Sequence, residues 1–89
     1  MEKEEIISIM EGFMVQLVPS MESVVITPNH SLKELGLDSI ERMEIINSTM
    51  EEVGVEIVPK EFINAKNIGD IAEIMRNKLE NKKQLEDKR

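Results

Sequence analysis

The segment LGLDSIERMEIINSTMEEVGVEI, residues 35–57, carries the clearest secondary-structure signal of the chain. Asp38 and Glu41 have the spacing of a capping box, in which two side chains satisfy free backbone N–H groups at a helix start. Gly54 stands where a left-handed residue often ends a helix. Between them, apolar residues recur at the three- and four-residue steps of an amphipathic helix: Ile40, Met43, Ile45 or Ile46, Met50 and Val53. The segment therefore predicts a helix that begins near Ser39 and ends before Gly54.

Helical spacing of apolar residues also appears on both sides of this segment. Residues 3–18 have apolar side chains at Ile6, Ile7, Met10, Phe13, Met14 and Leu17, and Pro19 follows as a stop signal. Asn67 is a favourable cap for a last helix with a stripe at Ile68, Ile71, Ala72, Ile74 or Met75, and Leu79. Pro59 fits the first turn of a short helix in KEFIN, residues 60–64.

The segments between the predicted helices differ in character. Residues 20–38 form a long connection with scattered aliphatic side chains, so we expect it to pack against the domain. SLKEL, residues 31–35, fits one helical turn, and VEIV, residues 55–58, alternates like a strand without a partner strand. We therefore predict an all-α fold: a small four-helix bundle of three longer helices and one short third helix, with a long loop between helices 1 and 2. Residues 1–80 form the helical domain, and the charged segment 81–89 is expected to fray.

Composition limits the partners and the location that we expect for the protein. The 89 residues suffice for one small domain, and 18 acidic against 11 basic residues give a net charge of −7. A negative field of this kind argues against nucleic acid and anionic membranes and favours basic protein surfaces. No apolar run approaches the roughly 20 residues of a membrane span, and the start MEKEE lacks the features of a signal peptide. We therefore expect a soluble, cytoplasmic monomer that neither binds nucleic acid nor inserts into a membrane.

The chain has few residues that could act in catalysis or bind a metal. The chain has no cysteine and one histidine, His30, so we predict neither a metal site nor a thiol of its own. A hydrolytic Ser39–His30 pair would need an acid, an oxyanion hole and a pocket, and no nucleophile-elbow glycine pattern is present. We therefore predict no enzymatic activity and no catalytic residue.

The order and spacing of these features resemble the acyl carrier protein family over residues 5–79. The resemblance is carried by LGLDSIERMEIINSTMEEVGVEI, then IVPKEF and KNIGDIAEIM, with Asp38-Ser39-Ile40 in place of the family's D-S-L. It implies that Ser39 is the attachment point of 4′-phosphopantetheine, delivered from coenzyme A by a phosphopantetheinyl transferase. The thiol of that arm would carry acyl groups as thioesters. Asp38 would be the adjacent acidic residue of the motif, helping to orient the serine and to engage the transferase.

The resemblance also implies partner enzymes, among them acyl transferases and ketosynthases of fatty-acid or polyketide biosynthesis. These would dock through basic surfaces on the second helix, at Glu41, Glu44, Glu51 and Glu52, with Met43 as an apolar contact among them. Arg42 departs from the acidic or neutral side chain common in fatty-acid carriers. Met10, Met14, Met43, Met50 and Ile46 are the candidates for lining a cleft that shelters an acyl chain.

Two alternatives remain open at this point. A peptidyl or D-alanyl carrier would share the serine and differ in the enzyme that activates its cargo. An unmodified acidic helical adaptor would use Ser39 only as a helix cap, and its replacement by alanine would then cost about 1 kcal/mol of stability.

Overall fold

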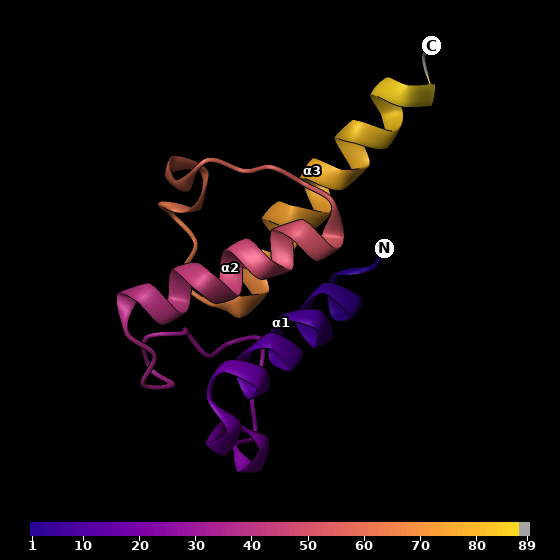
Figure 1. Ribbon diagram of the computed structural model, residues 1–89. Coiled ribbons are helices and arrows are strands. Elements are labelled where there is room, and N and C mark those ends of the chain that lie inside the picture. The colour runs from indigo at the N-terminus through magenta and orange to yellow at the C-terminus, as the bar shows by residue number, and fades with distance from the viewer. Residues whose placement is uncertain (88–89) are drawn as a thin grey trace.

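The computed structural model of the chain describes residues 1–87, with side chains through residue 83. Its elements are α1 (Lys3–Leu17), η1 (Pro19–Ser23), α2 (Ser39–Val53), η2 (Pro59–Phe62) and α3 (Ile68–Asp87), where η denotes a 3-10 helix. No strand occurs within residues 1–87, so the predicted all-helical class is confirmed. The helix α1 packs against both α2 and α3, and α3 extends beyond the other helices at its C-terminal end (Figure 1).

The predicted short third helix takes a different form. Pro59 begins a segment at the predicted place, but it is a 3-10 turn of four residues, Pro59–Phe62, and not an α-helix. The SLKEL segment forms the single helical turn that was predicted: the Leu35 N–H donates to the Ser31 carbonyl, four residues back, at 3.3 Å. Residues 55–58 lie in neither a helix nor a strand, and their burial alternates as predicted, with Val55 and Ile57 buried.

The core lies where the three α-helices meet. Its fully buried side chains come from all three helices: Ile6, Met10, Met14, Ile45, Thr49, Ile68 and Met75. The connection between α1 and α2 also contributes, because Met21, Leu32 and Leu37 are buried, whereas Val24 and Val25 in the same connection are exposed. In α3 the buried alternative of the predicted pair is Met75, and Ile74 is half-buried.

The predicted apolar stripe of α2 is wrong at its N-terminal end. Ile40 is 75% exposed and Met43 is 60% exposed, whereas the core face runs through Ile45, Thr49 and Val53 at four-residue steps. Thr49 can occupy the core because its hydroxyl donates to the Ile45 carbonyl at 2.7 Å, which satisfies the buried polar group. The stripe of Ile40 and Met43 therefore faces outward, which matters for the site below.

The helix α3 continues to Asp87, into the segment 81–89 that is expected to fray; helical backbone alone does not test fraying, and residues 88–89 lie outside the described part. Within the described residues, no helix has both the length and the apolar character of a membrane span.

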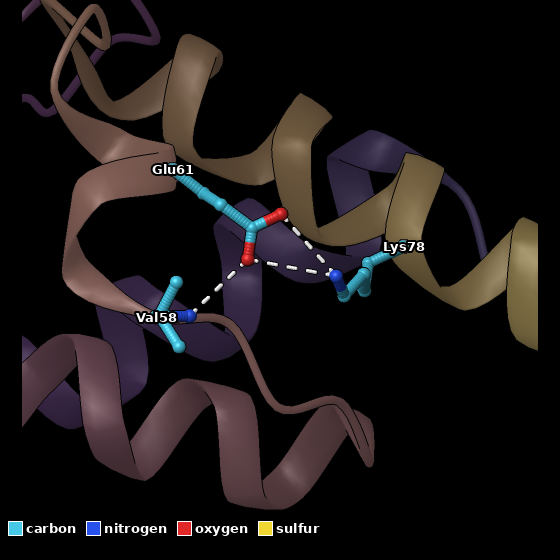
Figure 2. A network of polar contacts seen from close by, with 3 residues as sticks. All are labelled: Val58, Glu61 and Lys78. Atoms are coloured by element: carbon cyan, nitrogen blue, oxygen red, sulfur yellow. Dashed lines mark hydrogen bonds and ion pairs between the residues drawn. The ribbon is translucent and has the colours of Figure 1, made fainter.

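An ion pair holds η2 to α3. Lys78 Nζ lies 3.2 Å from Glu61 Oε1, and the Val58 N–H donates to Glu61 Oε2 at 3.2 Å (Figure 2). The hydrogen bond from Lys78, followed by the one from the Val58 N–H, lowers the pKa of Glu61 below its ordinary value. Any stabilisation from this lowered pKa is present above the ordinary pKa and is lost as the pH falls through the lowered one.

Replacement of Lys78 by glutamine is expected to raise the pKa of Glu61 toward its ordinary value, because the largest cause of the shift is removed. A carboxyl NMR titration of Glu61 measures this directly. The control is Lys60→Gln, since Lys60 only adds the weakest attraction to Glu61 and should give a smaller rise. An unchanged titration in Lys78→Gln would show that the pair does not form in solution.

Candidate functional site at the start of α2

The chain reaches α2 through a tight turn anchored in the core. Gly36 has a φ of +88°, in the left-handed region that glycine adopts most readily, and its N–H donates to the Lys33 carbonyl at 3.0 Å. Leu37 is buried, with its N–H donating to the Leu32 carbonyl at 3.3 Å. The turn and the buried leucine fix the direction in which the next two residues leave the core.

The predicted capping box is confirmed, and it assigns the cap to Asp38. The Glu41 N–H donates to Asp38 Oδ1 at 2.8 Å, and the Asp38 N–H donates to Glu41 Oε1 at 2.9 Å. Ser39 is therefore the first residue inside the helix. Its side chain is exposed, and within the described residues its hydroxyl has no hydrogen-bond partner. The alternative in which Ser39 caps the helix is thus not the geometry of this chain.

This geometry fits the attachment of a phosphate ester. The free backbone N–H groups and the positive dipole end of a helix start favour an anion, and the Ser39 hydroxyl is accessible there. The groove beside it, with a volume of about 250 Å³, lies between α2 and η2. Its lining includes Met43, Asn47 and Met50 from α2 and Pro59 and Phe62 from η2.

Three of the five side chains predicted to line an acyl cleft lie together at the surface, and the other two lie in the core. Met43, Ile46 and Met50 line the groove beside Ser39. Met10 and Met14 do not, because they are 0% exposed in the core face of α1. Their helical spacing with Ile6 is that of core residues, so packing in the core explains their burial.

The acidic residues of α2 divide into two groups. Glu44 and Glu51 are exposed and seven residues apart, which places them on one side of the helix, together with Ile40 four residues before Glu44. Glu41 is half-buried and its carboxylate is engaged in the cap. Glu52 is exposed, but its spacing places it on the side of Glu41. Ile40, which the helical pattern assigned to the core, therefore joins Glu44 and Glu51 on an exposed face.

His30 does not take part in this site. Its Nδ1 accepts the Thr27 N–H at 3.0 Å, and its carbonyl accepts the Ile68 N–H at 2.9 Å, so it ties the connection to the start of α3. In the described part of the chain, no three His, Cys, Asp or Glu side chains come together in a way that could hold a metal ion.

The fold and the site together define a small all-helical carrier module with one exposed serine at a capped helix start. Comparison with known proteins supports this class of protein. The family described as "Phosphopantetheine attachment site" matches residues 14–75, a span that includes Ser39. A curated relative, the polyketide biosynthesis acyl-carrier-protein AcpK of Bacillus subtilis (strain 168), is 31% identical over 80 residues, which cover 90% of this chain and 98% of the relative.

A solved structure is also similar over nearly the whole chain. It is the crystal structure of the curacin biosynthetic pathway HMG synthase in complex with acetyl donor-ACP, with 37% sequence identity and a TM-score of 0.80, covering 88% of this chain and 100% of the matched one. The protein belongs to the acyl carrier protein family, whose prosthetic group is 4′-phosphopantetheine.

Proposed function

We propose that this chain carries acyl groups as thioesters on a 4′-phosphopantetheine arm attached to Ser39. The observation that carries the proposal is the freedom of the Ser39 hydroxyl: Asp38 provides the helix cap, which leaves the neighbouring serine exposed at the positive end of α2. The Ser39 oxygen would lose its proton and attack the phosphorus of coenzyme A that bears the pantetheine. The P–O bond of the pyrophosphate would break, adenosine 3′,5′-bisphosphate would leave, and the arm would remain on Ser39 as a phosphodiester. The arm supplies the thiol that this cysteine-free chain lacks.

The pathway follows from the relatives. One is named for polyketide biosynthesis, and the acyl carrier of the similar structure is an acetyl donor in the curacin pathway. We therefore place this chain in polyketide biosynthesis in preference to fatty-acid synthesis. In this role the protein is a substrate of other enzymes and not a catalyst. It acts as a monomer in the cytoplasm. Residues 1–80 form its carrier domain, with η2 as the short third helix.

The direct test is incubation with coenzyme A, Mg²⁺ and a promiscuous phosphopantetheinyl transferase, followed by intact-protein mass measurement. We expect a gain of one phosphopantetheine. A malonyl transferase should then load the arm, whereas adenylation enzymes that load amino acids should not, which separates acyl from peptidyl and D-alanyl carriers. A chain that stays unmodified beside a carrier that is fully modified would overturn the proposal.

The exposed face of α2 is the proposed docking surface for the transferase and the later enzymes. Of the five predicted docking residues, Met43, Glu44 and Glu51 are exposed, and Glu51 lies near the C-terminal end of α2. We add Ile40, which is 75% exposed and next to the serine. Glu41 and Glu52 would contribute from the adjoining side of the helix. Acidic rim charges mainly set the rate of association with basic partners, which suits a carrier that must dissociate readily.

Reversal of two of these charges is expected to slow loading. In Glu44→Lys/Glu51→Lys, kcat/KM of the transferase should fall by about tenfold or more at low salt, and the difference should shrink as salt is added. The control is Glu4→Lys/Glu73→Lys, which makes the same change in net charge at two exposed carboxylates on α1 and α3. Equal losses in the two variants would mean that only net charge matters and that the α2 face is not the docking surface.

A further inference from the structure

A second groove adjoins the one beside Ser39, and it has the opposite electrostatic sign to the rest of the chain. It has a volume of about 320 Å³ and is formed by the turn before α2, by α2 itself and by the residues that precede and begin α3. Three cations, Lys33, Arg42 and Lys66, line it, and no carboxylate does. In a chain with a net charge of −7, this is a local reversal of charge, and we call it the cationic groove.

The three cations are not paired with carboxylates. Among the described residues the ion pair is Lys78–Glu61, which lies elsewhere. The acidic residues closest to Lys33 and Lys66 accept backbone groups: Glu34 Oε1 accepts the Ser31 N–H, and Asp70 Oδ2 accepts the Lys66 N–H, both at 2.9 Å. Next to Arg42, Glu41 Oε1 accepts the Asp38 N–H, and Glu44 is exposed and does not line the groove. These carboxylates keep their charge, but none of them lines the groove or forms an ion pair with the three cations within the described residues.

Arg42 is the best placed of the three. It is half-buried, and its Nη1 donates to the Leu37 carbonyl at 2.9 Å, which holds the guanidinium against the turn that precedes Ser39. A guanidinium has five N–H donors in a rigid fork, so the bond to Leu37 leaves most of them for another acceptor. That fork matches the two oxygens of a carboxylate.

The two grooves share part of their lining. Arg42, Ile46 and Phe62 line both of them, whereas Ser39 lines the first alone. A flexible chain that is fixed to Ser39 and lies in the first groove therefore contacts side chains that also line the second. Between the cations, the cationic groove is apolar, with Leu32, Ile46, Phe62, Ala65 and Ile71 in its lining. An apolar groove with unpaired cations in its lining is complementary to a molecule with an aliphatic middle and an anionic end.

We propose that the cationic groove binds the free carboxylate of a dicarboxylic acyl group carried on the arm, with Arg42 as the main contact and Lys33 and Lys66 as supporting charges. This inference rests on the proposed attachment at Ser39. It assigns the chain a cargo preference: acyl groups that end in a carboxylate are seated beside α2, and the corresponding uncharged acyl groups are not. The seated group is held away from the docking face at Ile40, Glu44 and Glu51.

The test compares two cargoes of equal carbon number. The transferase loads the full chain from glutaryl-coenzyme A, from pentanoyl-coenzyme A and from coenzyme A alone, and each product is checked by intact mass. NMR then follows the Arg42 side-chain Nε–H and the methyl groups of Ile46, Ala65 and Ile71. We expect glutaryl to shift the Arg42 signal and the methyl signals, with a smaller effect at high salt. Pentanoyl and the bare arm should leave the Arg42 signal in place.

Two variants isolate the charges. Arg42→Gln should remove the glutaryl-specific methyl shifts, and Lys33→Gln/Lys66→Gln should reduce them while the bond from Arg42 to Leu37 stays intact. The control, Lys60→Gln, removes an exposed cation of η2 that does not line the groove. Equal shifts with glutaryl and pentanoyl would overturn the inference. An Arg42 shift with the bare arm would overturn it too, because the cations would then bind the phosphate. Loading of none of the three donors would instead overturn the proposed attachment, and this inference with it.

Discussion

Replacement of Ser39 by alanine is expected to abolish phosphopantetheine loading completely and to leave the free energy of unfolding almost unchanged. The two effects separate because the structure divides two roles between neighbouring residues. Asp38 accepts the Glu41 N–H and caps α2, whereas the Ser39 hydroxyl is exposed and lies outside that cap. Loss of an uninvolved surface hydroxyl usually changes stability by less than about 0.5 kcal/mol. Loss of the acceptor oxygen leaves nothing to form the phosphodiester.

The matched control is Asp38→Ala, which removes the cap and keeps the serine. It should cost about 1 kcal/mol of unfolding free energy and still allow some loading. Stability is best followed by circular dichroism during urea denaturation, because the chain has neither tryptophan nor tyrosine. A Ser39→Ala protein that is still modified would move the attachment to another hydroxyl. One that loses about 1 kcal/mol and binds its partners as before would instead support the helical adaptor.

Local chemistry explains why the start of α2 could be predicted so closely. A capping box needs only Asp38 and Glu41 at the right spacing, and a left-handed helix end needs only Gly54, whose φ is +87°. Both signals act within one or two turns of backbone. The same locality predicted the alternating burial of residues 55–58 and the element that begins at Pro59.

The choice of the buried face could not be made in the same way. Residues 40–53 contain two apolar stripes, one through Ile45 and Val53 and the other through Met43, Ile46 and Met50. Hydrophobicity alone favours the second stripe, because Thr49 interrupts the first. The structure buries the interrupted stripe, since the Thr49 hydroxyl bonds to the Ile45 carbonyl and so enters the core satisfied. A hydrophobicity scale that rates each residue separately does not take this hydrogen bond into account.

The grooves depend on contacts between distant segments. Phe62 of η2 lines both grooves with residues of α2, and η2 is held in place by Lys78 of α3, 17 residues further along the chain. The charge of Arg42 could be read from the sequence, but its place beside Lys33 and Lys66 required the fold. The serine was therefore predictable from its motif, and its surroundings were not.

The largest expected change in stability comes from the side of α2 that faces the core. Ile45→Ala should lower the free energy of unfolding by about 2–5 kcal/mol, because it removes buried atoms and leaves a cavity. Ile45 is 1% exposed and lies where α2 packs against α1. A domain of 89 residues has only about 4–13 kcal/mol in total, so this variant should be partly unfolded under conditions that leave the parent intact. Urea denaturation followed by circular dichroism measures the loss.

Ile40→Ala is the matched comparison, since it makes the same chemical change on the same helix at a position that is 75% exposed. It should alter the unfolding free energy by less than about 0.5 kcal/mol and should instead weaken transferase docking, seen as a lower kcat/KM for loading. The opposite ranking, with Ile40→Ala the more damaging to stability, would mean that α2 buries its other stripe. The docking face and both grooves beside Ser39 would then have to be redrawn, because all three depend on how α2 is turned about its axis.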